Sequence, residues 1–492
     1  MSHHATNPPT QSPASRRQFL FNVGGGFGGL AIADLLHREQ LLARSTRQPL
    51  GVGTVHRNDG GLHRVPKIKR VVQLFMNGGA SPMDLFDYKP RLEELHGQRF
   101  DPGGDQRVEG VTGQTDFTVM KSPFKFRRYG HSGRWVSEVF PHIATCVDDL
   151  AFLMSMVSKS NVHGPASYMQ NTGFVDPGFP AMGAWVSYGL GSVNDNLPAF
   201  VVLPDPAGLP YNNRGNFESG FLPVRHQGML VRPHRPQPVA HLQPPAHAEH
   251  INRETEDDGY KLLRMLNEEH AADRPGDTRL ESRIASYELA ARMQLNAADV
   301  FDIENEPSHA ISMYGADAEP TQNFGRNCLI ARRLLERGVR FVQVWNGPGG
   351  PTNNWDNHGN IPAELPPRAA ETDKPTAALV RDLQQRGLWD DTLIIWTTEF
   401  GRQPFSQGQA GRDHNRGTFV SWLGGGPIKP GVAYGQSDEW AWKSLKPTWC
   451  YDLHATILHL MGIDHTRLTF RHNGIDRRLT DVHGHVIHEI LV

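Results

Sequence analysis

The sequence predicts an α/β fold in which a mostly parallel central sheet is flanked by helices. Two observations indicate this fold. An apolar, β-branched stretch over residues 67–79, "KIKRVVQLFMNGG", ends at a glycine pair, which is typical of a buried parallel strand. Further along, a helical pattern, a glycine and an apolar strand follow one another twice, over residues 327–345 and 375–398. A chain of 492 residues is long enough for one large domain with elaborations.

Each predicted helix has its own start or stop signal. In "NCLIARRLLERG" the apolar residues recur with helical spacing and Gly338 ends the helix, so "VRFVQVW" is the next strand. In "PTAALVRDLQQRG" we expect Pro375 at the helix start and Gly387 at its end, with "DTLIIWTT" following as a strand. A last helix, "YDLHATILHLMGID", has Asp452 as its predicted cap and Gly462 as its end.

The composition excludes several classes of function. The net charge is −2, which gives no electrostatic reason to expect nucleic acid as a partner. The three cysteines, Cys146, Cys328 and Cys450, are far apart, so neither a zinc knuckle nor a disulfide framework is indicated. The 25 histidines raise the expectation of metal or proton chemistry.

The first segment, residues 1–45, is predicted to be a signal region. Its stretch "SRRQFLFNVGGGFGGLAIADLL" resembles a twin-arginine export signal, with Arg16 and Arg17 as the arginine pair. The apolar part is too short and too rich in glycine to form a stable membrane span. We therefore expect a periplasmic or secreted protein; a basic tail without a sorting role is the alternative.

The rest of the chain is predicted to be one domain. Residues 46–66 have the composition of a polar linker, and residues 67–492 form the predicted domain. Within it, the proline-rich stretch near residues 232–250 indicates an excursion from the fold.

Polar residues follow the predicted strands at the point where each strand ends. In open α/β sheets ligands bind outside the carboxyl ends of the strands, so these residues are candidates for one site. Carboxylate and imidazole donors suit zinc, manganese or iron(II), and magnesium or calcium would be favoured only if few histidines take part. The candidate metal ligands are Asn77, Asp356, His358, Glu399, Asp413 and His414. Two ordinary ion pairs, Asp413 with Arg412 and Glu399 with Arg402, are the competing interpretations.

Several motifs carry a resemblance to a known family. The stretches "LFMNGGASPMDLFDYKP", "WDNHGN", "EFGRQP", "GRDHN" and "RLTDVHG" resemble an exported bacterial domain-of-unknown-function family, number fifteen-oh-one. That family resembles a divergent branch of the alkaline phosphatase and sulfatase superfamily, and the resemblance covers roughly residues 65–492. It implies an alkaline-phosphatase-like three-layer sandwich.

The sequence departs from the superfamily at three positions. The segment "HGPASYMQNTG" places His163 where the superfamily has its nucleophile. Asn77 stands in place of an aspartate, and Glu399 and Phe400 stand in place of an aspartate–histidine pair. One of the two metal subsites is therefore rebuilt. No cysteine begins the Cys-x-Pro-x-Arg segment of formylglycine sulfatases, so that mechanism is excluded.

Two hypotheses of function follow from the resemblance and the candidate residues. In the first, an exported hydrolase binds one or two divalent ions that activate water against a phosphate or sulfate ester. The substrate is a small anionic ester or a sulfated or phosphorylated glycan, and the candidate catalytic residues are His163, Glu399, Arg402 and Arg412. His163 is a nucleophile, a ligand, or a structural histidine at a helix end that is satisfied by a backbone carbonyl, and Glu399 is a ligand or a base. In the second, a catalytically degenerate relative binds a ligand or a partner protein. The oligomeric state stays open.

Overall fold

The structure is a computed structural model, and most of the chain beyond the predicted signal region is described. The described residues are 62–101, 117–239, 253–274 and 298–492, with 103, 108, 110–113, 277, 280, 284 and 287–289 between them. The signal region at residues 1–45 and most of the linker at residues 46–66 lie outside the described residues. Two compact units are present; residues 53–240 and 296–492 form one of them, and residues 241–295 belong to the other.

A sheet of nine strands forms the centre of the first unit, counted over the described residues. Its order is β12-β4-β11-β8-β1-β7-β5-β6, with β13 also paired to β4. The strands are β1 (Arg70–Met76), β4 (Leu150–Val157), β5 (Phe200–Leu203), β6 (Met229–Leu230), β7 (Phe341–Asn346), β8 (Thr392–Thr397), β11 (Phe419–Gly424), β12 (Ala433–Tyr434) and β13 (Thr448–Trp449).

The sheet is mostly parallel, as the sequence predicts. β1 pairs in parallel with both β7 and β8, so all three strands named from the sequence are interior strands of one sheet. β11 runs antiparallel to its two neighbours, β4 and β8. Because β4 is reversed relative to β11, it has the same direction as β8. The carboxyl ends of β1, β4, β7 and β8 therefore meet at one edge of the sheet.

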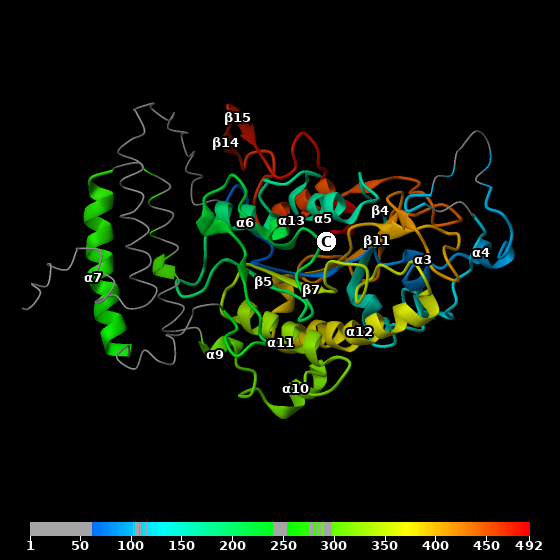
Figure 1. The fold of residues 1–492 in the computed structure, drawn as a ribbon, viewed down its shortest axis with the longest axis horizontal. Helices are drawn as coiled ribbons and strands as arrows, with labels where there is room; N and C mark the ends of the chain where they lie inside the picture. The colour runs from blue at the N-terminus through cyan, green and yellow to red at the C-terminus, as the bar shows by residue number, and fades with distance from the viewer. Residues whose placement is uncertain are drawn as a thin grey trace, which may run out of the picture. The chain divides into compact units, whose positions relative to one another are not determined.

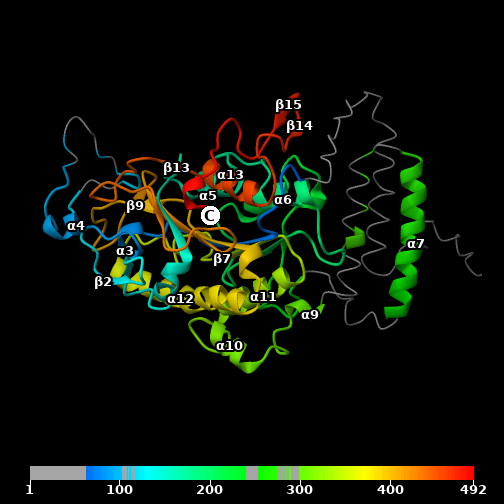
Figure 2. The ribbon, with the colours of Figure 1, turned by 180° about the vertical axis from the view of Figure 1, so that it is seen from behind.

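Helices cover both faces of the sheet and make three layers (Figures 1 and 2). One face carries α5 (His163–Thr172), α6 (Met182–Leu190) and α13 (Cys450–Leu460), and the other carries α11 (Gln322–Glu336) and α12 (Ile361–Gln385), against which α10 (Ser308–Tyr314) packs from outside. Phe75 and Trp345 of the sheet pack with Trp185 of α6 and Ile457 of α13 in one buried cluster. Burial of this apolar surface, at about 25 cal/mol per Å², is what holds the layers together.

Two helix boundaries differ from the expected ones. α12 begins at Ile361, so Pro375 lies inside the helix and does not start it. The earlier start was missed because Pro366 and Pro367 also lie inside α12, and proline normally ends a helical pattern. In α13 the cap is Trp449, and Asp452 is the third helical residue, whose carboxylate accepts the Trp449 backbone N–H at 2.9 Å. Gly338 follows α11 with a φ of 87°, as its role as a stop signal requires.

The remaining elements are short or stand apart from the sheet. They are α3 (Pro82–Leu85), α4 (Pro90–Glu94), α9 (Ala298–Phe301) and the pairs β2 (Phe126–Tyr129) with β3 (Arg134–Ser137), β9 (Gly401–Arg402) with β10 (His414–Asn415), and β14 (Phe470–His472) with β15 (Ile475–Arg477). The second unit contains α7 (Arg253–Ala272). In the proline-rich excursion, residues 233–239 form turns and bends, and residues 240–250 lie outside the described part. None of the helices in the described ranges has the length and apolar character needed to cross a membrane.

Candidate metal centre

The candidate site lies at the edge of the sheet where the parallel strands end. β4 leads to His163 at the start of α5, β7 leads to Asp356 and His358, and β8 leads to Glu399. His414 precedes β11, the antiparallel strand, whose amino-terminal end is at this same edge. The topology thus brings together donors from four separate parts of the chain.

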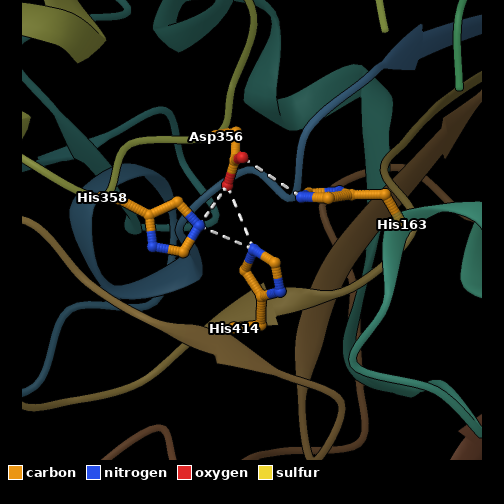
Figure 3. Close-up of side chains that lie close together, drawn as sticks. All are labelled: His163, Asp356, His358 and His414. Atoms are coloured by element: carbon orange, nitrogen blue, oxygen red, sulfur yellow. Dashed lines mark hydrogen bonds and ion pairs between the residues drawn. The ribbon is translucent and has the colours of Figure 1, made fainter. Parts of the chain in front are cut away.

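Four side chains converge at this edge (Figure 3). They are His163, Asp356, His358 and His414, and one ligand atom of each lies within 4.8 Å of those of the others. The Nε2 atoms of His358 and His414 are 2.8 Å apart. Oδ1 of Asp356 lies 2.7 Å from Nε2 of His358 and 3.1 Å from Nε2 of His414. Oδ2 of Asp356 lies 3.3 Å from Nε2 of His163.

Each of the three histidines has its other ring nitrogen, Nδ1, in contact with a different acceptor. His163 donates to Glu399 Oε1 at 2.7 Å, and His414 donates to the backbone carbonyl of Asn161 at 2.7 Å. Nδ1 of His358 lies 2.5 Å from Oε1 of Gln407. Metal-binding histidines commonly donate one ring N–H to such an acceptor, which leaves the other nitrogen for the metal.

His163 is held between aromatic rings as well as carboxylates. Its ring stacks on that of Tyr211, with the centroids 4.2 Å apart and the planes 6° apart. Burial lowers the pKa of His163, but the carboxylates of Asp356 and Glu399 more than offset it, so the pKa is raised overall. Burial and the same two carboxylates raise the pKa of Tyr211 to about 12, so its hydroxyl stays protonated and donates to the Gly350 carbonyl at 2.6 Å.

Asp356 is ionised and carries the negative charge of the group. Burial opposes its ionisation, but the Arg402 guanidinium and the three histidines hold the pKa of Asp356 well below its usual range. Arg402 donates to Oδ1 of Asp356 at 2.7 Å. Its other bonds go to backbone carbonyls, among them those of Gly79 at 2.7 Å and Arg412 at 3.1 Å. Arg402 is therefore paired with Asp356, and the competing pairing with Glu399 does not appear among its described bonds.

Glu399 lies just outside the group of four. It is completely buried, and its Oε1 accepts both the His163 ring N–H and the Gly78 backbone N–H, the latter at 2.8 Å. Its Oε2 accepts the Thr398 hydroxyl at 3.1 Å. A buried carboxylate with these donors orients His163 and increases the basicity of its ring.

Asp413, Arg412 and Asn77 also lie outside the group of four. Asp413 accepts the backbone N–H groups of Val111 and His414, each at 2.7 Å. Burial raises the pKa of the Asp413 carboxyl, but these and other hydrogen bonds lower it by more. The pKa is therefore below its usual value, and Asp413 is ionised. Nδ2 of Asn77 donates to the Pro348 carbonyl at 2.9 Å and so braces the loop that leads to Asp356.

Arg412 belongs to a buried ion pair. It is fully buried and makes two contacts with Asp84, from Nε at 2.7 Å and from Nη2 at 3.2 Å. Nη2 also donates to the Met120 carbonyl at 3.0 Å. The aspartate partner is thus Asp84, and the pairing of Arg412 with its neighbour Asp413 is not among its described contacts.

The four converging side chains fit a divalent transition metal. Three imidazole nitrogens and one carboxylate are the donor types that zinc and manganese accept in proteins. Nε2 of His163 is buried and makes no hydrogen bond of good geometry to any described residue. Burial, partly offset by Asp356, lowers the pKa of His414 to about 4, so its ring is neutral near pH 7, as a ligand must be.

Several supporting residues were not found from the sequence, Tyr211 beside His163 among them. Gln407, Thr112 and Asn161 contact the histidines or Asp413. Asn161 acts through its backbone carbonyl, which every residue has, so the sequence contains no signal for it. Gln407 and Thr112 are ordinary polar residues in loops, and only their positions in space give them a role.

A search of the curated proteins finds no match. Among the solved structures, the fold is similar to a sulfatase from Pseudoalteromonas sp., PsFucS1, at 12% identity and a TM-score of 0.32, covering 92% of this chain and 72% of that one. The alkaline phosphatase of the Antarctic bacterium TAB5 is 9% identical with a TM-score of 0.35, covering 81% and 98% of the two chains. Ps i-CgsB in complex with k-i-k-neocarrahexaose is 11% identical with a TM-score of 0.36, covering 80% and 72%.

A family model matches nearly the whole described domain. Its match extends over residues 68–491 and therefore includes all four residues of the metal centre. The family prediction made from the sequence motifs is confirmed: the chain belongs to the family described as a protein of unknown function, DUF1501.

Proposed function

We propose that the protein is a metal-dependent hydrolase of phosphate or sulfate esters, in which Asp356, His358 and His414 hold one divalent cation. The observation that carries this proposal is the convergence of His163 and these three side chains within 4.8 Å. Their charge balance supports it. Asp356 is ionised, and His414 is neutral at pH 7 because burial lowers its pKa to about 4.

The chain supplies a general base beside this cation. A divalent cation polarises an ester oxygen and lowers the pKa of water. His163 is oriented by Glu399 at Nδ1 and by its stacking on Tyr211, so Nε2 faces the centre and can take a proton from water. A catalytic metal site keeps an open position, so we assign three ligands and leave His163 as the base.

The proposed substrate is a small anionic ester or a sulfated or phosphorylated glycan. We also propose that the protein acts outside the cytoplasm, after export through the twin-arginine pathway.

Arg402 and Arg412 are fully buried and donate to protein acceptors. Both guanidiniums are therefore engaged by protein groups. The negative charge of an ester would be balanced by the bound cation.

A second candidate function is binding without catalysis. The bonding of the two candidate arginines favours it. Arg402 is paired with Asp356 and Arg412 with Asp84, so neither is free to stabilise the negative charge that develops on an ester in the transition state. If His163 is a fourth ligand, the site is closed, as in structural metal sites.

Metal binding and hydrolysis together test the proposal. Purified protein is stripped, reloaded with Zn²⁺ or Mn²⁺, and its metal content is measured alongside hydrolysis of 4-nitrophenyl phosphate, bis(4-nitrophenyl) phosphate and 4-nitrophenyl sulfate. His358→Ala and His414→Ala should each lower metal affinity by about 10-fold or more. His309→Ala is the matched control, because His309 is an exposed histidine of α10.

His163→Gln separates the two candidate functions. As a base, His163 contributes on the order of 10²-fold or more to the rate, so the variant should keep its metal and lose hydrolysis. Loss of metal in this variant would make His163 a ligand and favour the binding function. A wild-type protein that binds neither metal after reloading would overturn the proposal, and one that binds metal but cleaves no ester would replace it with the binding function.

A further inference from the structure

Asp413 is not among the four converging residues, yet side-chain hydrogen bonds link it to His358. The Thr112 hydroxyl donates to Oδ1 of Asp413 at 2.9 Å. Nε2 of Gln407 donates to the Thr112 hydroxyl oxygen at 2.6 Å. Oε1 of Gln407 lies 2.5 Å from Nδ1 of His358. Three loops that are distant in the sequence thus meet in one chain of hydrogen bonds.

The direction of every bond in this chain follows from counting protons. Asp413 receives the backbone N–H groups of Val111, Thr112 and His414, and these groups can only donate. The carboxylate is therefore an acceptor, and the Thr112 hydroxyl gives it the one proton that a hydroxyl has. The Thr112 oxygen is then left to accept, so Gln407 must present its NH₂ group there.

The same count fixes the proton on His358. Because the NH₂ group of Gln407 faces Thr112, its carbonyl oxygen faces His358. A carbonyl only accepts, so Nδ1 of His358 must carry the hydrogen. In a neutral imidazole with Nδ1–H, the lone pair is on Nε2, the atom that lies 2.8 Å from His414 Nε2 and 2.7 Å from Asp356 Oδ1.

We propose that Asp413, Thr112 and Gln407 are positioning residues that hold His358 in its Nδ1–H form and so direct its Nε2 toward the metal centre; this role rests on the proposed function for its purpose. Asp413 also fixes the backbone of His414 through the bond from its N–H. One carboxylate thereby controls two of the three proposed ligands without contacting the cation.

Thr112→Val removes the hydroxyl while leaving the shape of the side chain and the backbone bonds from residues 111 and 112 to Asp413. Without that acceptor, the Gln407 amide is free to turn over, and His358 should become a mixture of its Nδ1–H and Nε2–H forms. Thr112→Ser restores the hydroxyl and is the matched control. The form of His358 is measured from ¹⁵N shifts of the ring nitrogens in metal-free protein at alkaline pH, with the signal assigned by comparison with His358→Asn.

The expected result is Nδ1–H in the wild type and in Thr112→Ser, and a mixture in Thr112→Val with a fall in Zn²⁺ affinity of about 10-fold. An Nε2–H form in the wild type would overturn the proposal whether or not metal binds. An unchanged form and affinity in Thr112→Val would also overturn it, because Thr112 would then only dock a loop. If the wild type shows Nδ1–H but binds no metal, the proposed function fails while the assignment of the proton is confirmed.

Discussion

Glu399 binds Nδ1 of His163 through a hydrogen bond of 2.7 Å across 236 positions of sequence. The bond is possible because Glu399 follows the end of β8 at Thr397, and His163 begins α5 after β4 at the same edge of the sheet. It makes Glu399 the residue that orients the proposed base.

Glu399→Gln should lower hydrolysis by about 100-fold and leave metal content unchanged. The amide keeps the shape of the side chain but removes the charge that makes His163 a stronger base. Hydrolysis rates and metal content are measured on the same preparation, with the exposed residue Glu489 changed to Gln as the control. A parallel loss of metal would show that Glu399 takes part in binding the cation.

Gly78→Ala should disrupt the metal centre. Gly78 has a φ of 122°, and an added Cβ would lie 2.6 Å from the backbone nitrogen of Asp356. The loop bearing Asp356 must move, so metal affinity should fall by about 10-fold or more. Gly97→Ala is the matched control: its φ of 82° is also positive, but no atom lies within 4 Å of the added Cβ. It should lose only about 1–2 kcal/mol of stability and no metal affinity. Equal metal affinity in the two variants, by calorimetric titration, would contradict this.

Arg412→Ala should destabilise the fold by about 3–5 kcal/mol, because it leaves Asp84 as a buried charge without its partner. The measurement is denaturant unfolding monitored by circular dichroism. Arg471→Ala breaks the exposed pair with Asp476 and should cost at most about 1 kcal/mol. If Arg412→Ala keeps wild-type stability but loses hydrolysis, Arg412 has the catalytic role that the sequence suggested.

Stability should fall as the pH drops from 7 to 5. Burial, reinforced by Arg225, lowers the pKa of His226 to about 3, and burial lowers that of His454 to about 4, whereas the unfolded chain has an ordinary value near 6.5. Below pH 6.5 the unfolded state takes up protons that the folded state does not, so each histidine should remove about 2 kcal/mol over this interval.

Unfolding free energies at pH 7 and pH 5 check this dependence. His226→Asn and His454→Asn should each be less stable at pH 7, but each should show a pH-dependent loss about 2 kcal/mol smaller than the wild type. His309→Asn, at an exposed position, should leave the dependence unchanged. Equal pH dependence in all the variants would refute the role of these two buried histidines.

We propose that Arg16 and Arg17 direct export. Replacing both with Lys should leave the protein in the cytoplasm, because recognition of the signal depends on the guanidinium pair and not on charge alone. Cell fractionation with detection of the protein in each fraction is the measurement, and Arg44→Lys, within the same segment, is the control. Continued export of the double variant would be the contrary result.

The sequence by itself determined the parallel sheet, the edge of that sheet at which the site lies, and the family. Three mostly apolar, β-branched stretches became β1, β7 and β8 of one parallel sheet, because strands buried on both faces are near-continuous hydrophobic runs. The residues after such strands meet at one edge whatever the loops do in detail, so Asp356 and His358 were predicted together.

Only the tertiary structure decided which donors face the centre. Asp413 and His414 are neighbours in the sequence, but the Asp413 carboxylate accepts the backbone N–H groups of Val111 and Thr112, whereas the His414 ring enters the group of four. The partner of Asp356, Arg402, and the contact between Gln407 and Thr112, 295 positions apart, depend on how the loops pack. Loop packing arises from contacts distant in sequence, and no local pattern of residues encodes them.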